Sequence, residues 1–451
     1  MSLHSRRPAL VPPRSPLAGL LAGLWLTLHA LTGQAASPWP ESLSLEQALA
    51  MADEQQPDIR LAAAQLELAR AEQLRSQSLT GLQARLETRL RWIQPPSIAM
   101  DKSQDDHRLS LQVNKNLYDF GRSAAALAAS EAWLSSQQQR YRDAVNQYRL
   151  AVMQAFFDAV LSDQAYTRDN EDMSVAYIRY DRAQNRNELG QLSDIELLKA
   201  HSDYQAVRVR RYQSDARQRT SRAQLASLLN QPGKLPEELT VPTLPGNARP
   251  VPDDLSAWQQ EAQDNNPLLV ALRDEVARAQ RKLDAAKAFD NPTLQGQLEV
   301  SEYTRGSAAN DEWRAGVVLD VPLLTGGQAR AERARYRAEL LAARAQLEKA
   351  SRAVRQQLLE EWSRLGILKV ALERERVRGE YRELYLDRSR ALYELEVKSD
   401  LGDAMTQTSA ARYEQMRTEF ELALTWGRIE ALLGRRVAGT ATPPDDSGDR
   451  Q

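Results

Sequence analysis

The chain has 451 residues, with 59 Lys and Arg, 61 Asp and Glu, 4 His and no Cys. The lack of Cys excludes disulfides, thiolate metal sites, a Cys nucleophile and a lipid-modified N-terminal Cys. The net charge of −2 provides no overall basic field for nucleic acid. The aromatic content of 6% is low for a large globular core and favours long helices packed along seams.

The N-terminus predicts a secretory signal peptide. Arg6 and Arg7 precede the apolar run 17–31, and small residues follow it up to Ala35. This order is typical of an export signal, so cleavage is expected to remove residues 1–35. A retained anchor is the alternative, but the run is shorter than the about 20 residues of a membrane-spanning helix. No other run approaches such a helix, so the mature chain would have to cross a membrane with strands.

Two long stretches without Pro predict very long helices. Pro is absent between residues 97 and 231, and again between 323 and 442. Because Pro inside a helix costs about 3 kcal/mol or more, stretches of this kind can hold uninterrupted helices. Apolar residues in 141–159 and 354–372 follow heptad spacing, which predicts coiled-coil-like packing.

The predicted elements occur in the same order twice. The first structural repeat (36–231) and the second (257–436) each hold a helical run, two strands and a helical hairpin. The Pro-rich segment 232–256 connects them, and the polar tail 437–451 is expected to be disordered. The predicted strands and hairpins are 82–92, 108–118 and 122–230 in the first repeat, and 293–302, 312–323 and 328–434 in the second.

Short motifs also recur at a constant offset. Asn116–Gly121 corresponds to Pro322–Gly327, and Gly190–Asp194 corresponds to Glu396–Asp400, both at an offset of 206 (322 minus 116). A duplicated helix–strand–strand–helix–helix unit is the simplest explanation. The predicted fold class is therefore mainly α with a smaller β part.

Each predicted strand alternates apolar and polar residues over about ten positions, a length and pattern typical of transmembrane β-strands. Leu86, Leu111, Leu298 and Val317 lie on the apolar faces, and the opposite faces are mostly charged or polar. A soluble hairpin packed on its own helices is the alternative interpretation. It explains poorly why the outward positions of 82–92 are all polar, with three Arg among them.

Four strands are too few to close a barrel, and an open sheet edge in lipid leaves backbone groups without hydrogen bonds. Strands that cross a membrane would therefore require the chain to oligomerise. Two copies would form an eight-stranded barrel filled by side chains, and three would form a twelve-stranded barrel with room for water. The strand pattern does not choose between these numbers.

With these features, the chain resembles the TolC-like outer-membrane efflux proteins over about residues 41–436. The motifs that carry the resemblance are Leu-Tyr-Asp-Phe-Gly-Arg at 117–122, Pro-Leu-Leu-Thr-Gly-Gly at 322–327, Asn291-Pro292 before the third strand, and the turn around Gly190 and Ser193. Each motif alone is weak, but their order, their duplication and the signal peptide make a specific combination.

The resemblance implies a homotrimer whose twelve-stranded β-barrel, in contact with outer-membrane lipid, continues into a long periplasmic α-helical barrel. It implies a passive exit duct of a tripartite efflux or type I secretion system. Such a duct docks a periplasmic adaptor, or membrane fusion protein, and an inner-membrane transporter. The resemblance implies no enzymatic activity, no cofactor and no nucleic-acid partner. It does not indicate whether the cargo is a small molecule or a protein.

The resemblance also implies roles for particular residues. The periplasmic gate is expected to comprise Asp194, Glu196, Tyr393, Lys398, Asp400 and Asp403. The adaptor is expected to dock at Leu189, Gly190, Gln191, Leu395, Glu396 and Val397. The strand-to-helix passages are expected at Asp119, Gly121, Pro322, Gly326 and Gly327. Solvated helix-start residues that favour the helix dipole are the alternative interpretation of the acidic positions.

Two departures from the family pattern concern the second hairpin. Glu396 replaces the Gly of the tip, and Gly402 stands at the usual acidic position, with Asp403 beside it. Gly takes a positive φ at no steric cost, and Glu is expected not to do so. The adaptor-docking site at the second tip is therefore either absent from this chain or shaped for a particular adaptor.

Two other kinds of protein are alternatives to an exit duct. A periplasmic coiled-coil adaptor or scaffold would also have heptad hairpins, but it needs β-rich domains that this sequence lacks. An enzyme of the cell envelope would need a catalytic constellation. The two His of the mature chain, His107 and His201, have no third ligand at motif spacing, which predicts no metal site and no catalytic residue.

Overall fold

The computed structural model describes residues 42–51, 56–232, 235, 238–244, 249–306, 310–397 and 400–437. The chain divides into two compact units, Met1–Glu41 and Ser42–Gln451, and all described residues belong to the second. The predicted signal peptide, Lys398 and the tail from residue 438 lie outside the described residues. Every helix within the described ranges is too short or too polar to be a membrane span.

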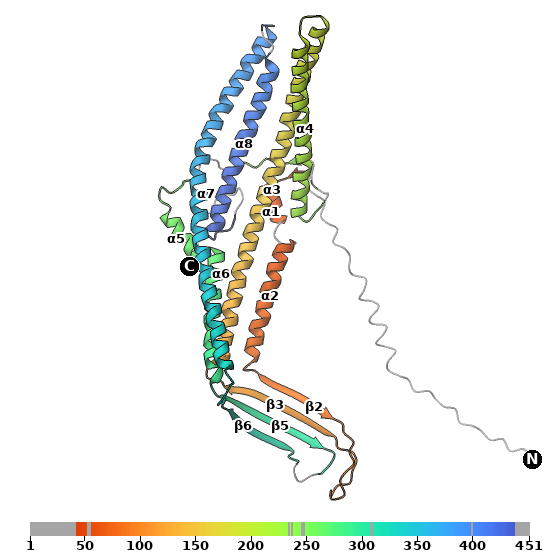
Figure 1. Cartoon of the computed structure of the whole chain (residues 1–451), viewed down its shortest axis with the longest axis vertical. Coiled ribbons are helices and arrows are strands. Elements are labelled where there is room, and N and C mark those ends of the chain that lie inside the picture. Colours follow the sequence, from red (N-terminus) through yellow and green to blue (C-terminus); the bar gives the residue numbers. More distant parts are fainter. Residues whose placement is uncertain are drawn as a thin grey trace, which may run out of the picture. The chain divides into compact units, whose positions relative to one another are not determined.

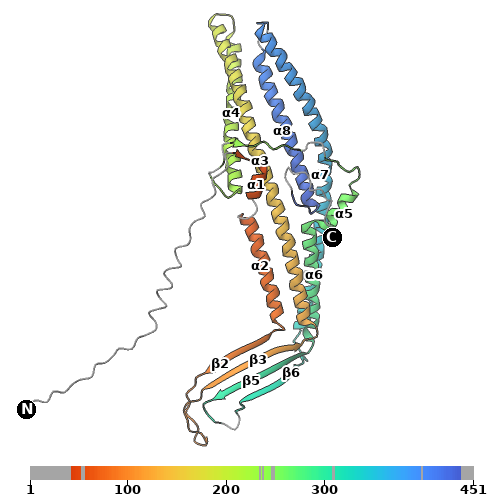
Figure 2. The same ribbon diagram turned by 180° about the vertical axis from the view of Figure 1, so that it is seen from behind.

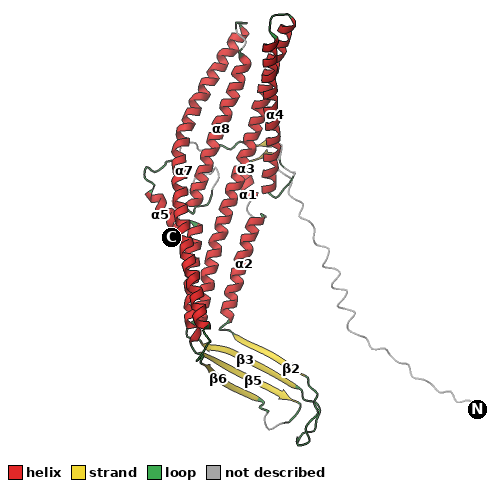
Figure 3. Cartoon of the chain, viewed as in Figure 1, coloured by secondary structure: helices red, strands yellow, loops and turns green. Residues whose placement is uncertain are grey.

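The helix–strand–strand–helix–helix order occurs twice, as predicted (Figures 1 and 3). The first copy consists of α2 (Pro57–Ser78), β2 (Leu82–Arg89), β3 (Arg108–Tyr118), α3 (Arg122–Glu188) and α4 (Asp194–Leu228). The second consists of α6 (Pro267–Lys287), β5 (Thr293–Tyr303), β6 (Trp313–Asp320), α7 (Gln328–Glu394) and α8 (Leu401–Leu432).

Smaller elements lie outside this repeat. The short strands β1 (Ser42–Leu43) and β4 (Glu238–Leu239) pair in parallel, and helices α1 (Leu45–Met51) and α5 (Ser256–Asn265) precede the first helix of each copy. The sequence did not predict these elements, because two-residue strands and helices of one to three turns leave too few positions for a periodic signal.

The described helices lie side by side, and the four-stranded sheet lies at one end of them, as the opposite views of Figures 1 and 2 agree. Helices α3 and α7 have 67 residues each, which corresponds to about 100 Å at 1.5 Å per residue. Near the sheet, neighbouring helices form a row in the order α2–α3–α6–α7. Farther from the sheet, the row is α4–α3–α8–α7.

The sheet has the order β2–β3–β5–β6, and all its neighbouring strands are antiparallel. Its register sorts side chains into rows that cross all four strands. One apolar row is Leu86–Leu111–Val300–Trp313, and the adjacent polar row is Arg85–Gln112–Glu299–Arg314. On the polar face, Glu299 pairs with Arg108 of β3 and with Arg314 of β6.

The apolar face of the sheet is exposed. Leu86 is 66% exposed, Trp313 is 69% exposed and Val317 is 63% exposed. A hairpin packed on its own helices would bury these residues, so that alternative interpretation is wrong. β6 ends at Asp320, earlier than predicted, because Pro322 has no N–H to continue the ladder.

The predicted helical seams form the core between the long helices. Val354, Leu358, Leu365 and Leu368 of α7 are buried and pack with apolar residues of α8. In the first copy, Tyr148, Val152, Ala155 and Ala159 are buried on α3, and the ring of Phe157 stacks on Phe420 of α8 with centroids 4.3 Å apart.

The last helix of each copy ends in a left-handed residue, Asn230 with φ 55° and Gly434 with φ 77°. Gly434 packs against the end of α5. A Cβ on Gly434 would lie 2.1 Å from the Asn265 carbonyl oxygen. Beyond it, Val437 is fully buried and its carbonyl accepts a hydrogen bond of 2.8 Å from Arg149. Val437 therefore belongs to the folded part, although the sequence analysis placed it in the tail.

We expect Gly434→Ala to destabilise the protein by at least about 2 kcal/mol, because it adds left-handed strain and a backbone clash. Thermal unfolding in detergent measures this. Gly366→Ala is the matched control, since Gly366 is exposed in α7 and its Cβ would meet nothing within 4 Å. That variant should be neutral or up to about 1 kcal/mol more stable. A midpoint for Gly434→Ala equal to that of the wild type would contradict the packing described.

Candidate functional site: the strand-to-helix passages and the hairpin tips

Both passages from strand to helix have the same backbone conformation. Phe120 and Gly121 before α3 have φ values of 54° and 90°, and Gly326 and Gly327 before α7 have 58° and 89°. Two consecutive left-handed residues turn the chain out of the sheet and into the helix. A Cβ on Gly121 or Gly327 would meet nothing within 4 Å, so glycine is needed there for its φ and not for space.

Asp119 fastens the first passage. Its buried carboxylate accepts hydrogen bonds from the Ser123 backbone N–H (2.9 Å), the Ser123 hydroxyl and the Asn116 amide (3.1 Å). Burial raises the pKa of the Asp119 carboxyl, but these hydrogen bonds outweigh burial and hold the pKa below its ordinary value. An ionised Asp119 thus satisfies a backbone donor in the first turn of α3.

The second passage uses different residues to fasten the same turn. Thr325 stands where the first copy has Asp119, and its carbonyl accepts the Gln328 N–H at 3.0 Å. The carboxylate near this passage is Asp290, which follows α6 and not β6. It forms an ion pair of 3.1 Å with Arg333 of α7. Pro322 lies between the end of β6 and the left-handed pair.

The first hairpin tip has a regular helix C-cap. Gly190 has φ 70°, its N–H donates to the Asn187 carbonyl at 2.9 Å, and the Gln191 N–H donates to the Arg186 carbonyl at 2.8 Å. This pair of bonds defines a Schellman motif. Leu189 is 71% exposed just before the left-handed residue.

The second tip has the same motif with Glu396 in the left-handed position. Glu396 has φ 57°, its N–H donates to the Tyr393 carbonyl at 3.0 Å, and the Val397 N–H donates to the Leu392 carbonyl at 3.0 Å. The expectation that Glu would not adopt this conformation is wrong. The two hydrogen bonds hold a non-glycine residue in a region that costs about 1–2 kcal/mol. Leu395 and Val397 are each 70% exposed, like Leu189 at the first tip.

The acidic residues of the first hairpin interact within that hairpin. Asp194 accepts a hydrogen bond of 2.9 Å from the Asn187 amide. Glu196 and Ser193 form a capping box at the start of α4. Hydrogen bonds from the Ser193 side chain and backbone hold the pKa of Glu196 below its ordinary value. Both carboxylates thus stabilise the turn in the single chain, as the helix-start interpretation expects.

The acidic residues of the second hairpin reach other helices. Asp403 of α8 forms an ion pair with Arg179 of α3, so it joins the two hairpins. Asp400 accepts a hydrogen bond of 2.9 Å from the Tyr385 hydroxyl on α7. The other expected gate residues are Tyr393, which is 52% exposed, and Lys398, which lies outside the described residues.

Helices α3 and α8 approach closely beside this ion pair. A Cβ on Gly402 would lie 3.1 Å from Val175 of α3. About two helical turns further along α8, Ser409 donates a hydrogen bond to Glu171 of α3. The small residue at position 402 therefore permits the contact between hairpins, and the neighbouring Asp403 supplies the charge.

Sequence reasoning missed the partners Tyr385 and Arg179. Tyr385 lies 15 residues before Asp400 in the same hairpin, so antiparallel pairing across the predicted tip could have found it. Arg179 belongs to the other hairpin, and no spacing rule connects it to Asp403.

The described residues, which include His107 and His201, hold no cluster of three or more potential metal ligands. The His107 ring accepts the Arg91 N–H at 3.2 Å and packs edge-on against Trp92. The His201 ring stacks on Tyr180. Both rings are therefore used in packing.

Comparison with known proteins identifies the fold. The outer-membrane channel CmeC of Campylobacter jejuni has a TM-score of 0.73 at 12% identity, over 91% of this chain and 92% of that one. The outer-membrane channel MtrE of Neisseria gonorrhoeae, solved in its open state, has 0.69 at 16% identity, over 88% and 91%. The outer-membrane protein VceC of Vibrio cholerae has 0.68 at 14% identity, over 87% and 96%.

These likenesses confirm that the chain has the fold of outer-membrane channel proteins, as its resemblance to the TolC-like family implied. Protein CyaE of Bordetella pertussis is 30% identical over 222 residues. That segment covers 47% of this chain and 45% of CyaE, so the chain matches about half the length of this curated relative. No protein-family model matches the chain.

We expect Glu396→Gly to stabilise the second tip by about 1 kcal/mol, because glycine relieves the left-handed strain. Hydrogen exchange of the amides around Leu395 and Val397 measures the local effect. Glu396→Ala is the control that removes the charge and keeps the strain, so it should leave protection unchanged. Equal effects of the two variants would show that charge, and not backbone conformation, determines the stability of this tip.

Proposed function

We propose that this chain is the outer-membrane exit duct of a tripartite efflux or type I secretion system, located in the cell outer membrane and extending into the periplasm. The observation that carries the proposal is the sheet, whose apolar rows are exposed on one face while its polar rows lie on the other. A single chain cannot cover these rows, and lipid is the environment that suits a face of this kind. The polar, solvated faces of helices about 100 Å long suit a water-filled conduit across the periplasm.

The strand directions support closure of the sheet by identical copies. The four strands alternate in direction, so β6 runs opposite to β2. The free edge of β6 can therefore pair with β2 of the next copy and continue the antiparallel ladder without a break. Three copies would form a barrel of twelve strands, wide enough for water and cargo. The homotrimer thus satisfies the backbone groups of both open edges, which lipid cannot do.

The tips are the proposed periplasmic gate and docking surface. The Arg179–Asp403 ion pair and the Tyr385–Asp400 hydrogen bond tie neighbouring helices together where the tube would narrow. The exposed apolar residues Leu189, Leu395 and Val397 project at the turns, where a periplasmic adaptor would dock. In this proposal the chain contacts the inner-membrane transporter through that adaptor or directly, and it performs no catalysis.

A periplasmic adaptor or scaffold remains the alternative function, and the exposed sheet argues against it. A soluble protein that displayed the row Leu86–Leu111–Val300–Trp313 to water would expose a contiguous apolar patch and two free strand edges. Both features promote aggregation in solution.

The oligomeric state tests the duct directly. We expect protein purified in detergent to have the mass of three chains after subtraction of the bound detergent. Light scattering coupled to size-exclusion chromatography measures it. A monodisperse monomer, or recovery of the protein from the soluble periplasmic fraction without detergent, would refute the proposal.

We expect Asp403→Asn to raise the leak conductance of the protein in planar bilayers, because it breaks the charge pair with Arg179 that joins the hairpins. Asp387→Asn is the matched control, since Asp387 is exposed and, among the residues that the structure describes, its ion pair is with Arg390 of the same helix, at 3.5 Å. Exposed ion pairs of that kind contribute little. Equal conductance of the two variants and the wild type would remove Asp403 from the gate.

A further inference from the structure

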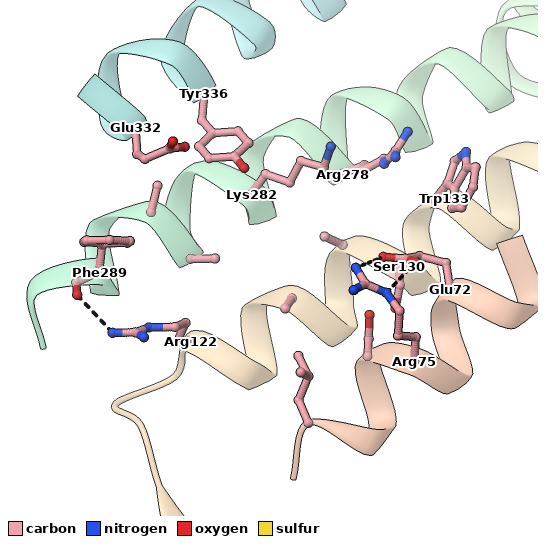
Figure 4. Close-up of a pocket in the computed structure, with 16 residues that line it drawn as sticks. Glu72, Arg75, Arg122, Ser130, Trp133, Arg278, Lys282, Phe289, Glu332 and Tyr336 are labelled. Carbon is pink, nitrogen blue, oxygen red and sulfur yellow. Dashed lines mark hydrogen bonds and ion pairs between the residues drawn. The ribbon is translucent and has the colours of Figure 1, made fainter. Parts of the chain in front are cut away.

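A pocket of about 360 Å³ lies between the ends of the helices nearest the sheet. Residues of α2, α3, α6 and α7, together with Phe289, line it (Figure 4). These helices form a row in the order α2–α3–α6–α7, so α2 and α7 stand at its two edges. Because residues of both edge helices reach this pocket, we place it on the concave side of a curved row. In the proposed tube, the concave side faces the lumen, and the pocket would occur once per chain just below the membrane.

Basic residues outnumber acidic residues in this pocket. Its lining contains Arg75, Arg122, Arg278 and Lys282, but only Glu72 and Glu332 carry negative charge. Such an excess of positive charge in a concave, partly apolar site favours an anion over a cation.

The three arginines already have partners. Arg75 makes two hydrogen bonds of 2.8 Å to Glu72, both drawn in Figure 4. The Arg278 guanidinium lies 4.6 Å from the ring centre of Trp133 and forms an ion pair of 3.2 Å with Glu275. Arg122 donates to the Phe289 carbonyl at 2.9 Å. These contacts hold the arginines in place along the pocket wall.

Lys282 differs from the arginines. Its ammonium makes no hydrogen bond or ion pair with any residue that the structure describes, although the side chain is half-buried. Burial lowers the pKa of this ammonium, and the positive charge of Arg278 lowers it further. The nearby carboxylates of Glu275 and Glu339 offset this only in part, since each pairs with an arginine. An incoming anion would relieve the unfavourable charge.

The rest of the lining is apolar and aromatic. Trp133 of α3, Phe289 and Tyr336 of α7 contribute aromatic rings to the lining, with Phe289 and Trp133 toward opposite ends of the pocket, and the remaining lining of α3 and α6 includes small alanines. A lining that combines aromatic rings with basic side chains suits a flat apolar body that carries a negative group.

We propose that this pocket is a binding subsite for aromatic organic anions, with Lys282 as the residue that recognises the negative group. The inference rests on the proposed duct, in which it assigns a preferred cargo chemistry to the wall of the tunnel. A subsite at this depth would hold such molecules briefly below the membrane before they leave, and it would disfavour aromatic cations.

The test uses 2-naphthoate as the probe and 2-naphthamide as its neutral analogue, titrated by isothermal calorimetry into the full-length protein purified in detergent. We expect 2-naphthoate to bind the wild type at least about tenfold more tightly than Lys282→Gln, the effect of losing one charge-assisted contact. Lys287→Gln is the matched control, because Lys287 lies on the same helix, is 56% exposed and pairs with Asp284 at 2.9 Å outside the pocket. It should bind 2-naphthoate like the wild type, and 2-naphthamide should bind the wild type more weakly than 2-naphthoate.

Partition of 2-naphthoate into detergent affects the wild type and both variants equally and therefore cancels when these proteins are compared. Equal binding to wild type and Lys282→Gln, equal binding of the two probes, or no binding at all would each overturn the proposal. The titration needs no adaptor and no conductance. Absence of binding to a wild-type protein that still has the mass of three chains would reject the subsite alone, whereas a monomeric mass would count against the duct.

Discussion

The structure depends on one constraint. The apolar face of the sheet and the two edge strands, β2 and β6, need partners that a single chain does not provide. The register lines up apolar side chains across four strands, and no helix of the described unit packs on them. Backbone groups at a free edge need hydrogen-bond partners, and in lipid another strand is the only source. The alternating strand directions allow identical copies to supply that strand. The proposed assembly, location and conduit all follow from this one requirement.

Duplication explains why the two halves of the chain share a backbone but differ in chemistry. Positions 206 residues apart have the same left-handed conformation at the passages, as Phe120 and Gly326 do, and at the tips, as Gly190 and Glu396 do. The side chains near these turns differ. Asp119 caps α3 in the first copy, whereas Asp290, which follows α6, pairs with Arg333 of α7 in the second. The backbone of the repeat is therefore more constant than its side-chain contacts, and the ion pair that joins the two hairpins takes one charge from each copy, Arg179 from the first and Asp403 from the second.

Sequence patterns predicted the elements that depend on local periodicity. Alternation located the strands and their apolar faces, Pro-free stretches located the long helices, and the heptad seam located Leu358 and Leu365 in the core. Contacts between segments far apart in the chain could not be predicted in this way. The Arg179–Asp403 pair joins two hairpins, and the Lys282 pocket needs four helices at once. The error at Glu396 has another cause, since a residue preference of about 1–2 kcal/mol was treated as a prohibition, and two backbone hydrogen bonds were enough to overcome it.

The left-handed pairs at the passages also have a mechanical consequence. Each is followed by an unbroken rod of 67 residues, so each is the pivot of a lever whose far end is a hairpin tip. Over about 100 Å, a rotation of one degree at the pivot displaces the tip by about 2 Å. By this geometry, a small torsional change next to the sheet would become a displacement of the tip comparable to the width of a water molecule, and a force applied at a tip would become a slight twist where the rod meets the strand.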